Sequence, residues 1–515
     1  MWRHPDSRTA SGLAAALLLA ACSTGGLMRP LPTPVANGWS AQAGPEVVPP
    51  RADWWRALND PTLDALVVHA VETSPNLQSA AAKVAQASAQ MQISGAAVLP
   101  QHSIGGSLNQ YRLPPEVAEK LKGIDPDIVL GRVQIGSQWE LDLWGKARNA
   151  KRADAYGYLG AQAAYRAALV SLIGDLTAAY VDVRAAERRL AIAQQQAAIR
   201  EAGLKLAKAR HRDGTSDGGD PAQARALAGQ QQAVVATLAD AVTQGRAKVA
   251  LLAGMPVQQA APLLDTPAAI PAAGAATDPG LPRDLLRARP DVMQAELAAR
   301  AQYARLKSAK ASLYPSFALS GSLGLSATTI GKSSLSDIFS WDKRLITNGL
   351  SLTMPLFDHG RLAGQVEVQD AAFEQAIQAY MQAVLAAQHD VESALSQQRA
   401  AQASLTLLHG VASDMRRQVT LAEARYRRGT GTRQDLLTAQ VNALAAEDAV
   451  AQAQGNAATA YVALQRALGL GAGVPGMPPM LSPDTRQRME ERTRWGERLS
   501  ALSGGASAAL AEAVK

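Results

Sequence analysis

Apolar side chains recur every seven residues through residues 145–214, a long segment that contains no proline. The recurring positions are Leu169, Leu176, Val183, Leu190, Ala197 and Leu204. A later segment repeats the pattern, with one polar exception, at Val384, Val391, Gln398, Leu405, Ala412 and Val419. Sustained heptads are typical of helices that pack side by side as in coiled coils. At 1.5 Å per residue the pattern predicts helices of about 100 Å, which need neighbours to cover a narrow apolar stripe.

Four shorter segments alternate between apolar and polar residues and predict β-strands: residues 102–110, 132–143, 316–326 and 350–356. Alternating runs of about 9–11 residues suit a membrane barrel with its apolar side chains toward lipid. A soluble antiparallel sheet with one buried face would show the same alternation. Four strands cannot close a barrel, whose known minimum is about eight, so a barrel needs a dimer with about 8 strands or a trimer with about 12.

The chain also repeats itself at an offset of 215 residues. The matching positions are mostly turn-forming and capping residues: Pro75 with Pro290, Pro100 with Pro315, Gly145 with Gly360, Gly214 with Gly429, Asp220 with Asp435, and Gly254 with Gly469. A fixed period across such residues indicates two copies of one structural unit. We assign the copies to residues 61–254 and 283–470, joined by a linker at 255–282.

Each copy predicts a helix, two strands, a very long helix and a returning helix, so the fold class is mainly α with a small membrane β-barrel portion. The helices are expected to begin at the prolines, which suit the first helical turn. They should end before Pro100 and Pro315, because a proline disfavours helix in the residue before it. Residues 471–515 exceed this unit, and their proline, glycine and mixed charge predict a mostly disordered tail with a short helix near 486–502.

Composition narrows the function. The single cysteine excludes an intrachain disulfide, and the net charge of +7 is spread along the chain, which does not indicate nucleic-acid binding. The seven histidines show no metal-ligand spacing. Residues 331–333 (GKS) are too far from Gly324 for a phosphate loop, and residues 471–476 fit a dinucleotide motif by letter but follow a predicted helix and contain a proline. We therefore expect that the protein is not an enzyme and binds no metal or other cofactor. The one non-protein group that we expect is a covalently attached lipid.

That lipid is expected on Cys22. Arg3 and Arg8 precede an apolar run that ends at Ala21, the layout of a secretory signal peptide over residues 1–21. The Leu19 to Cys22 segment resembles a bacterial lipobox, in which a diacylglycerol is attached to the cysteine; the alternative is a plain signal with a chance cysteine. Residues 22–60 would then form a lipidated, extended leader.

Several motifs resemble the outer-membrane efflux lipoproteins of the NodT and TolC-like type. They are residues 53–61 (DWWRALNDP), 139–146 (WELDLWGK), 281–292 (LPRDLLRARPDV) and 309–316 (AKASLYPS). The resemblance implies a TolC-like channel-tunnel: a homotrimer in the cell outer membrane with a 12-stranded barrel and a periplasmic α-helical barrel. It also implies contacts with outer-membrane lipid, a periplasmic adaptor protein and an inner-membrane pump.

Such a channel would be a passive conduit of a tripartite, RND-type efflux system that exports drugs or other small toxic compounds. Two alternatives remain open from the sequence. One is an outer-membrane channel for type I protein or oligosaccharide secretion. The other is a coiled-coil scaffolding lipoprotein without a pore.

The resemblance further implies a periplasmic aperture lined by carboxylates where the long helices turn. By repeat position these are Asp220 and Asp435, and in a trimer six carboxylates would favour cations. The local alternative is that each aspartate caps the returning helix, as Asp220 before Pro221 suggests. Thr438 stands where relatives often carry a second acid.

Gly431 replaces a charged gating partner of relatives, and Tyr426, Arg427 and Arg433 are candidate substitutes that would tether neighbouring helices. The turns themselves resemble the family's adaptor contacts. They are the pairs Gly214 with Thr215 and Gly429 with Thr430, in which glycine permits close backbone approach.

Overall fold

The computed structural model describes residues 31, 33–35, 38–39, 47–48, 51–120, 125–266, 268–272, 276–277, 280, 289–330, 334–473 and 478–493. The expected signal peptide 1–21, the lipidation candidate Cys22 and the tripeptide 331–333 lie outside the described residues. So do residues 281–288 of the third family motif and the chain from residue 494 onward.

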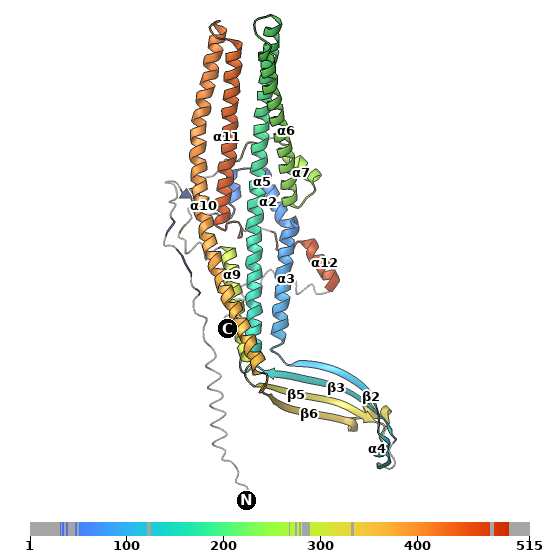
Figure 1. The fold of residues 1–515 in the computed structure, drawn as a ribbon. Helices are drawn as coiled ribbons and strands as arrows, with labels where there is room; N and C mark the ends of the chain where they lie inside the picture. Colours follow the sequence, from blue (N-terminus) through green and yellow to red (C-terminus); the bar gives the residue numbers. More distant parts are fainter. Residues whose placement is uncertain are drawn as a thin grey trace.

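Each repeat builds the expected helix, strand pair, long helix and returning helix. The first repeat has α3 (Pro75–Ala96), β2 (Gln101–Arg112), β3 (Asp127–Leu141), α5 (Lys146–Arg212) and α6 (Gly219–Ala253). The second has α9 (Pro290–Ala311), β5 (Ser316–Thr328), β6 (Arg344–Thr353), α10 (His359–Arg427) and α11 (Arg433–Ala467). The helices run along one elongated body, and the strands bend away at one of its ends (Figure 1). The predicted mainly α class is confirmed.

Shorter elements surround this frame. They are η2 (Trp54–Leu58), α2 (Pro61–Thr73), α4 (Pro115–Lys120), α7 (Val257–Leu264), η3 (Leu335–Phe339), η4 (Trp341–Lys343) and α12 (Pro483–Thr493). The short strands β1 (Val47–Val48) and β4 (Ala276–Thr277) pair in parallel, which joins the leader to the segment between the repeats.

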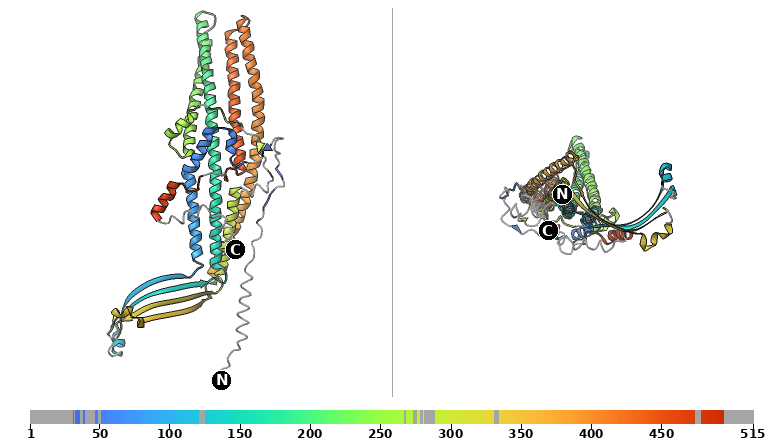
Figure 2. Two further views of the ribbon diagram at one scale, coloured as in Figure 1. Left: turned by 180° about the vertical axis from the view of Figure 1, so that it is seen from behind. Right: turned by 90° about the horizontal axis from the view of Figure 1, so that it is seen from below.

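Two helices, α5 and α10, run the length of the body, whereas α3 and α6, and likewise α9 and α11, follow each other along it (Figures 1 and 2). At the first junction, Gly254 has a φ of +72° and lies against Thr73 and Ser74. At the second, Gly469 has a φ of +70° and lies against Arg289 and Pro290. A left-handed glycine follows α6 and α11 and ends each of them tightly enough for the start of α3 or α9 to pack against it.

The largest core lies where these junctions meet α2. Trp54 and Trp55 are buried there, and Trp54 makes edge contacts with the rings of Trp55 and Tyr461. Asp60 caps α2 by accepting from the backbone N–H groups of Thr62 and Leu63, and it also accepts from Tyr180 Oη at 2.6 Å. Residues just ahead of the first repeat therefore anchor the middle of α5.

β2, β3, β5 and β6 form one antiparallel sheet in that order, with β2 and β6 at its edges. The register aligns one apolar row across the sheet, formed by Ile104, Ile135, Leu323 and Ile346. The adjacent row on the other face is Ser103, Gly136, Ser322 and Thr347. The predicted alternation is confirmed, because one face is apolar and exposed while the other is polar.

Some boundaries differ from the sequence expectation. β6 begins at Arg344 and ends at Thr353, so Met354 and Leu356 lie beyond the strand. The intervening Pro355 has no amide hydrogen to donate to a strand ladder. The first helix of each repeat stops at Ala96 or Ala311, a few residues earlier than expected.

The C-terminal segment contains a short helix that begins slightly earlier than expected. Within residues 471–515 the sequence predicts a helix near 486–502 in a mostly disordered tail, and the structure has α12 from Pro483 to Thr493. Leu481 is buried in the main core, and the Ser482 backbone N–H donates to Gln78 Oε1 at 3.0 Å. An apolar anchor and a backbone hydrogen bond therefore hold this segment against α3. Among the described residues, no helix combines the length and the apolar character needed to cross a membrane.

Candidate functional site at the tips of the long helices

The two hairpin tips, residues 213–218 and 428–432, share one backbone geometry. Gly214 and Gly429 adopt φ values of +69° and +75°, and nothing lies within 4 Å of a Cβ built on either. Thr215 and Thr430 each donate both the backbone N–H and the hydroxyl to a carbonyl of the preceding helix, those of Arg210 and Arg425. The threonines thus satisfy helix-end carbonyls, and the exposed glycine backbone is left open to an incoming partner.

Asp435 has a local structural role. It forms a capping box with Thr432: the aspartate N–H donates to Thr432 Oγ1 at 3.1 Å, and Thr432 N–H donates to Asp435 Oδ2 at 2.9 Å. The Thr432 hydroxyl adds a bond to the same oxygen at 2.7 Å. These hydrogen bonds lower the pKa of Asp435, so the carboxylate stays ionised at the exposed start of α11.

Asp220 is placed differently. The N-cap of α6 is Gly218, and the aspartate that accepts a backbone N–H at this turn is Asp217, from Gly219 at 2.8 Å. Asp220 instead lines a cavity of about 240 Å³ between α5, α6 and α11, together with Arg210, Gln434 and Thr438. Among the described residues it makes no hydrogen bond or ion pair, so its carboxylate is available toward the second hairpin.

The candidate lock residues are not joined to one another within the protomer. Arg427 forms an ion pair with Glu423 of its own helix at 2.5 Å. Tyr426 and Arg433 are exposed, and their side chains have no hydrogen-bond partner among the described residues. The structure explains why residue 431 is a glycine. A Cβ atom at this position would lie only 3.0 Å from Arg425 Cβ.

The two tips differ in charge. Around the second tip, residues 425–435 include Arg425, Arg427, Arg428 and Arg433 and a single acid, Asp435. Around the first tip, residues 210–220 include Asp213, Asp217 and Asp220 with Arg210 and Arg212.

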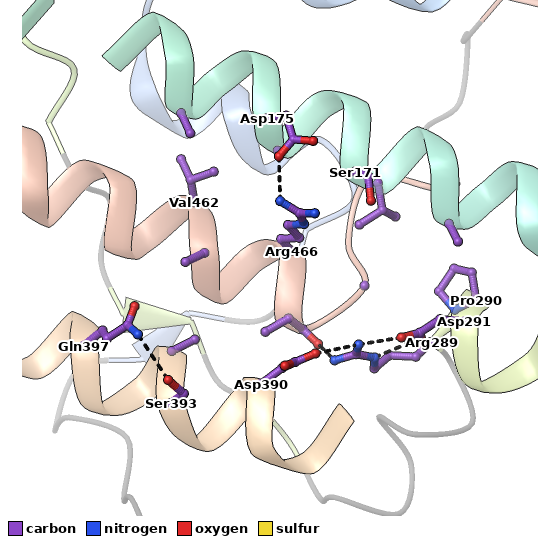
Figure 3. Close-up of a pocket in the computed structure, with 18 of the residues that line it drawn as sticks. Ser171, Asp175, Arg289, Pro290, Asp291, Asp390, Ser393, Gln397, Val462 and Arg466 are labelled. Carbon is purple, nitrogen blue, oxygen red and sulfur yellow. Dashed lines mark hydrogen bonds and ion pairs between the residues drawn. The ribbon is translucent and has the colours of Figure 1, made fainter. Parts of the chain in front are cut away.

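A second cavity, of about 530 Å³, lies at the junction of α9 and α11 between α5 and α10 (Figure 3). Arg289, which is 6% exposed, donates to the Ala467 carbonyl and forms ion pairs with Asp291 at 2.6 Å and Asp390 at 3.2 Å. Across the cavity, Arg466 of α11 pairs with Asp175 of α5 at 2.6 Å. These bridges tie the end of α11 to its three neighbouring helices.

Burial alone would lower the pKa of Arg289, but its bonds with Asp291 and Asp390 outweigh burial, and the net pKa is raised. Burial opposes ionisation of Asp291 as well, yet the hydrogen bonds from Arg289 keep the pKa of that carboxyl below its usual range. The sequence did not point to a role for Arg289. The one sequence feature that could have suggested it is that Arg289 directly precedes Pro290, as Ser74 precedes Pro75 in the first repeat.

The described residues contain no cluster of three or more histidine, cysteine, aspartate or glutamate side chains that could hold a metal ion.

Comparisons with known proteins agree with this architecture. Residues 66–255 and 281–470 each match the outer membrane efflux protein family. The chain is 30% identical over 466 residues to the pyoverdine export outer membrane protein OpmQ of Pseudomonas putida, covering 88% of this chain and 96% of that protein. It is 29% identical over 467 residues to the outer membrane protein OprJ of Pseudomonas aeruginosa, covering 90% and 95%.

Solved structures resemble it along nearly their whole length. The outer-membrane channel OprN superposes with a TM-score of 0.78 at 28% identity, over 87% of this chain and 99% of that one. The open-state MtrE outer membrane channel of Neisseria gonorrhoeae gives 0.74 at 25% identity, over 87% and 98%. The efflux-channel family and the outer-membrane location implied by the sequence motifs are confirmed. This chain is a member of the outer membrane efflux protein family and has the channel fold of OprN and MtrE.

Proposed function

We propose that this outer-membrane channel works as a homotrimer that receives small toxic compounds from an adaptor and an inner-membrane pump and conducts them passively to the exterior. The observation that carries the proposal is the pair of open edges, β2 and β6, on a sheet with an exposed apolar face. Unpaired backbone is not tolerated in lipid, so the edges must pair with other copies. Three copies bring about twelve strands together, within the range of known barrels.

The long helices and their tips support the adaptor contact. The tips are the part of the body farthest from the sheet, and their left-handed glycines leave exposed backbone that a partner's helical hairpin can approach closely (Figure 1). We assign this contact to Gly214, Thr215, Gly429 and Thr430. Asp220 and Asp435 would line the aperture, with Tyr426, Arg427 and Arg433 tethering neighbouring protomers around it.

The printed names of relatives support the cargo class. They include a pyoverdine export protein and the toluene efflux pump outer membrane protein TtgF of Pseudomonas putida. Both cargoes are small molecules, so for this chain we propose small toxic compounds rather than proteins or oligosaccharides.

We also propose that residues 1–21 are removed and that Cys22 carries the lipid. The lone cysteine at the end of the apolar run supports this. Labelled palmitate should enter the wild-type protein and be absent from the Cys22→Ser variant. Equal labelling of both would contradict the assignment.

The experiment that tests the function is deletion of the gene followed by a panel of toxic compounds, with complementation by the wild-type chain. Increased sensitivity to small compounds, restored by complementation, together with single-channel currents from purified protein, is the expected result. Unchanged sensitivity with loss of an exported protein or oligosaccharide would favour secretion instead. A protein that gives no current would contradict the channel.

A further inference from the structure

The cavity of about 530 Å³ at the junction of α9 and α11 opens on one side of the helix layer, as the faces of α11 show. Tyr461 lies in the main core, and Leu464 lies in the cluster on which Trp39 of the leader packs. Val462 and Arg466 line the cavity instead. At 3.6 residues per turn, the two pairs point to largely opposite sides of the helix.

The long helix α10 is divided in the same way. Val384 and Val391 lie in the two clusters on which residues of the leader pack. His389 and Ser393, on the other face of this helix, line the cavity. The leader therefore lies on one side of the helix layer, and the cavity opens on the other.

The side that carries the leader is the outer side of the proposed channel. The leader connects these contacts to Cys22, whose proposed lipid inserts into the membrane around the barrel. In a closed ring of helices the opposite side of the layer faces the lumen. The cavity is then a luminal recess, and a trimer has three of them at one level of its tunnel.

Two carboxylates on opposite sides of the luminal recess each keep a free oxygen. They are Asp175 of α5 and Asp390 of α10, which are equivalent positions of the two repeats (Figure 3). Asp175 binds Arg466 through Oδ1, and Asp390 binds Arg289 through Oδ2. Among the described residues, Asp175 Oδ2 and Asp390 Oδ1 accept no hydrogen bond. Both side chains are close to half exposed, at 45% and 49%.

The charged groups of the luminal recess do not balance. Three carboxylates and two guanidinium groups line it: Asp175, Asp291, Asp390, Arg289 and Arg466. His389, the other titratable group of the lining, adds no charge while it is neutral. The excess is therefore one negative charge, which attracts a cation and repels an anion.

The remaining walls are small and mainly apolar. Val170 of α5 and Val462 of α11 contribute to them, together with several alanines. The volume of about 530 Å³ lies within the range of about 300–1,000 Å³ that is usual for sites of small molecules. A ligand that fits both the charge and the walls has a positive group and an apolar body.

We propose that the luminal recess binds small organic cations with an apolar body and retains them briefly on their way through the channel. Asp175 and Asp390 hold the positive group, and Val170 and Val462 contact the body. Because both carboxylates stay in contact with water, their attraction is screened and the cation can leave again. The inference rests on the closed oligomer of the proposed function and adds a cargo class and a place where it binds.

The test is fluorescence polarisation of two dyes of opposite charge, ethidium and fluorescein, with the purified full-length trimer. We expect ethidium to bind and fluorescein to bind at least about ten-fold more weakly. Asp175→Asn combined with Asp390→Asn should weaken ethidium binding by about ten-fold or more, since it removes both charges. Binding of the dye to detergent is common to all variants and cancels in their comparison.

Three further variants make the test specific. Asp414→Asn, which removes a 70% exposed carboxylate of the same helix α10, is the matched control and should leave ethidium binding unchanged. Ser393→Phe keeps every charge and fills the luminal recess, so it should weaken binding even if the asparagine variant does not assemble. The aperture variant Asp220→Ala/Asp435→Ala should retain the binding, because the tips lie far from this junction (Figure 1).

The side on which the recess opens is tested with Ser393→Cys in a planar bilayer. A long poly(ethylene glycol) maleimide attached there should block the single-channel current, whereas the wild type should be unaffected. A labelled channel with full current would overturn the luminal position. Equal binding of the two dyes, or ethidium binding that neither the asparagine nor the phenylalanine variant weakens, would overturn the recess as a cation site in a channel that still conducts. A monomer without current would instead contradict the proposed function.

Discussion

Arg289, the residue before α9, donates a hydrogen bond from Nη1 to the carbonyl of Ala467, the last residue of α11, at 2.7 Å. The other junction is closed in a related way, because Thr73 Oγ1 donates to the carbonyl of Ala253, the last residue of α6, at 2.9 Å. Each bond satisfies a carbonyl that a helix end leaves without a partner. The second junction uses a charged side chain that also binds Asp291 and Asp390.

Arg289→Ala should therefore destabilise the channel, because it leaves a helix-end carbonyl and two aspartates without their donor. The expected loss is about 1–3 kcal/mol per protomer, the usual cost of orphaned partners. A lower melting temperature at fixed protein concentration would measure it. Arg300→Ala is the matched control, since Arg300 is half-exposed and forms its ion pair with Glu296 one turn away on the same helix. Equal shifts for the two variants would contradict the role of Arg289.

The same junction predicts a pH dependence. Since the folded state holds the pKa of Asp291 below its ordinary value of 3.8, the stabilising effect of this carboxylate is complete above that value. It is lost as the pH falls through the lowered pKa. The melting-temperature difference between wild type and Asp291→Asn should be constant from neutral pH down to about pH 4 and should shrink below it. A difference that grew in acid would have the wrong sign.

Gly429→Ala and Gly410→Ala should have opposite effects. At Gly429 the backbone φ of +75° strains any residue with a Cβ, so alanine should destabilise the tip by about 1–2 kcal/mol. Gly410 lies inside α10 with open space around it, so alanine should stabilise the helix by about 0.8–1 kcal/mol. Hydrogen exchange at the second tip and melting temperature measure the two effects. Stabilisation by Gly429→Ala would show that the turn does not require glycine.

The aperture assignment predicts that Asp220→Ala combined with Asp435→Ala raises the resting conductance and lowers the cation preference of the purified channel. Removing six carboxylates per trimer would weaken the field at the mouth. Because Asp435 also caps α11, Thr432→Ala separates the effects: it removes the cap bond and keeps the charge. Asp240→Ala, on the exposed side of α6, is the remote control. Unchanged conductance in the double variant would remove the assignment.

Which of the two aspartates, Asp220 or Asp435, caps its helix could not be predicted from the sequence. Asp220, which precedes a proline, had the stronger sequence case for a helix cap, yet it makes no cap hydrogen bond. Asp435 forms the capping box, through Thr432 at the preceding turn. The difference depends on how each loop approaches its helix, and the repeat offset carries no information about that.

The sequence by itself determined the features that depend on neighbours along the chain. Heptad stripes, strict alternation, glycine turns and the 215-residue repeat specify long packed helices, half-apolar strands and a duplicated unit, because period and backbone conformation are local properties. The tertiary structure alone decided the hydrogen bonds of Arg289, the packing of Leu481 and Ser482 against the core and α3, and the pairing register of the strands. Each of these joins residues far apart in the chain, where burial and geometric fit choose the partner.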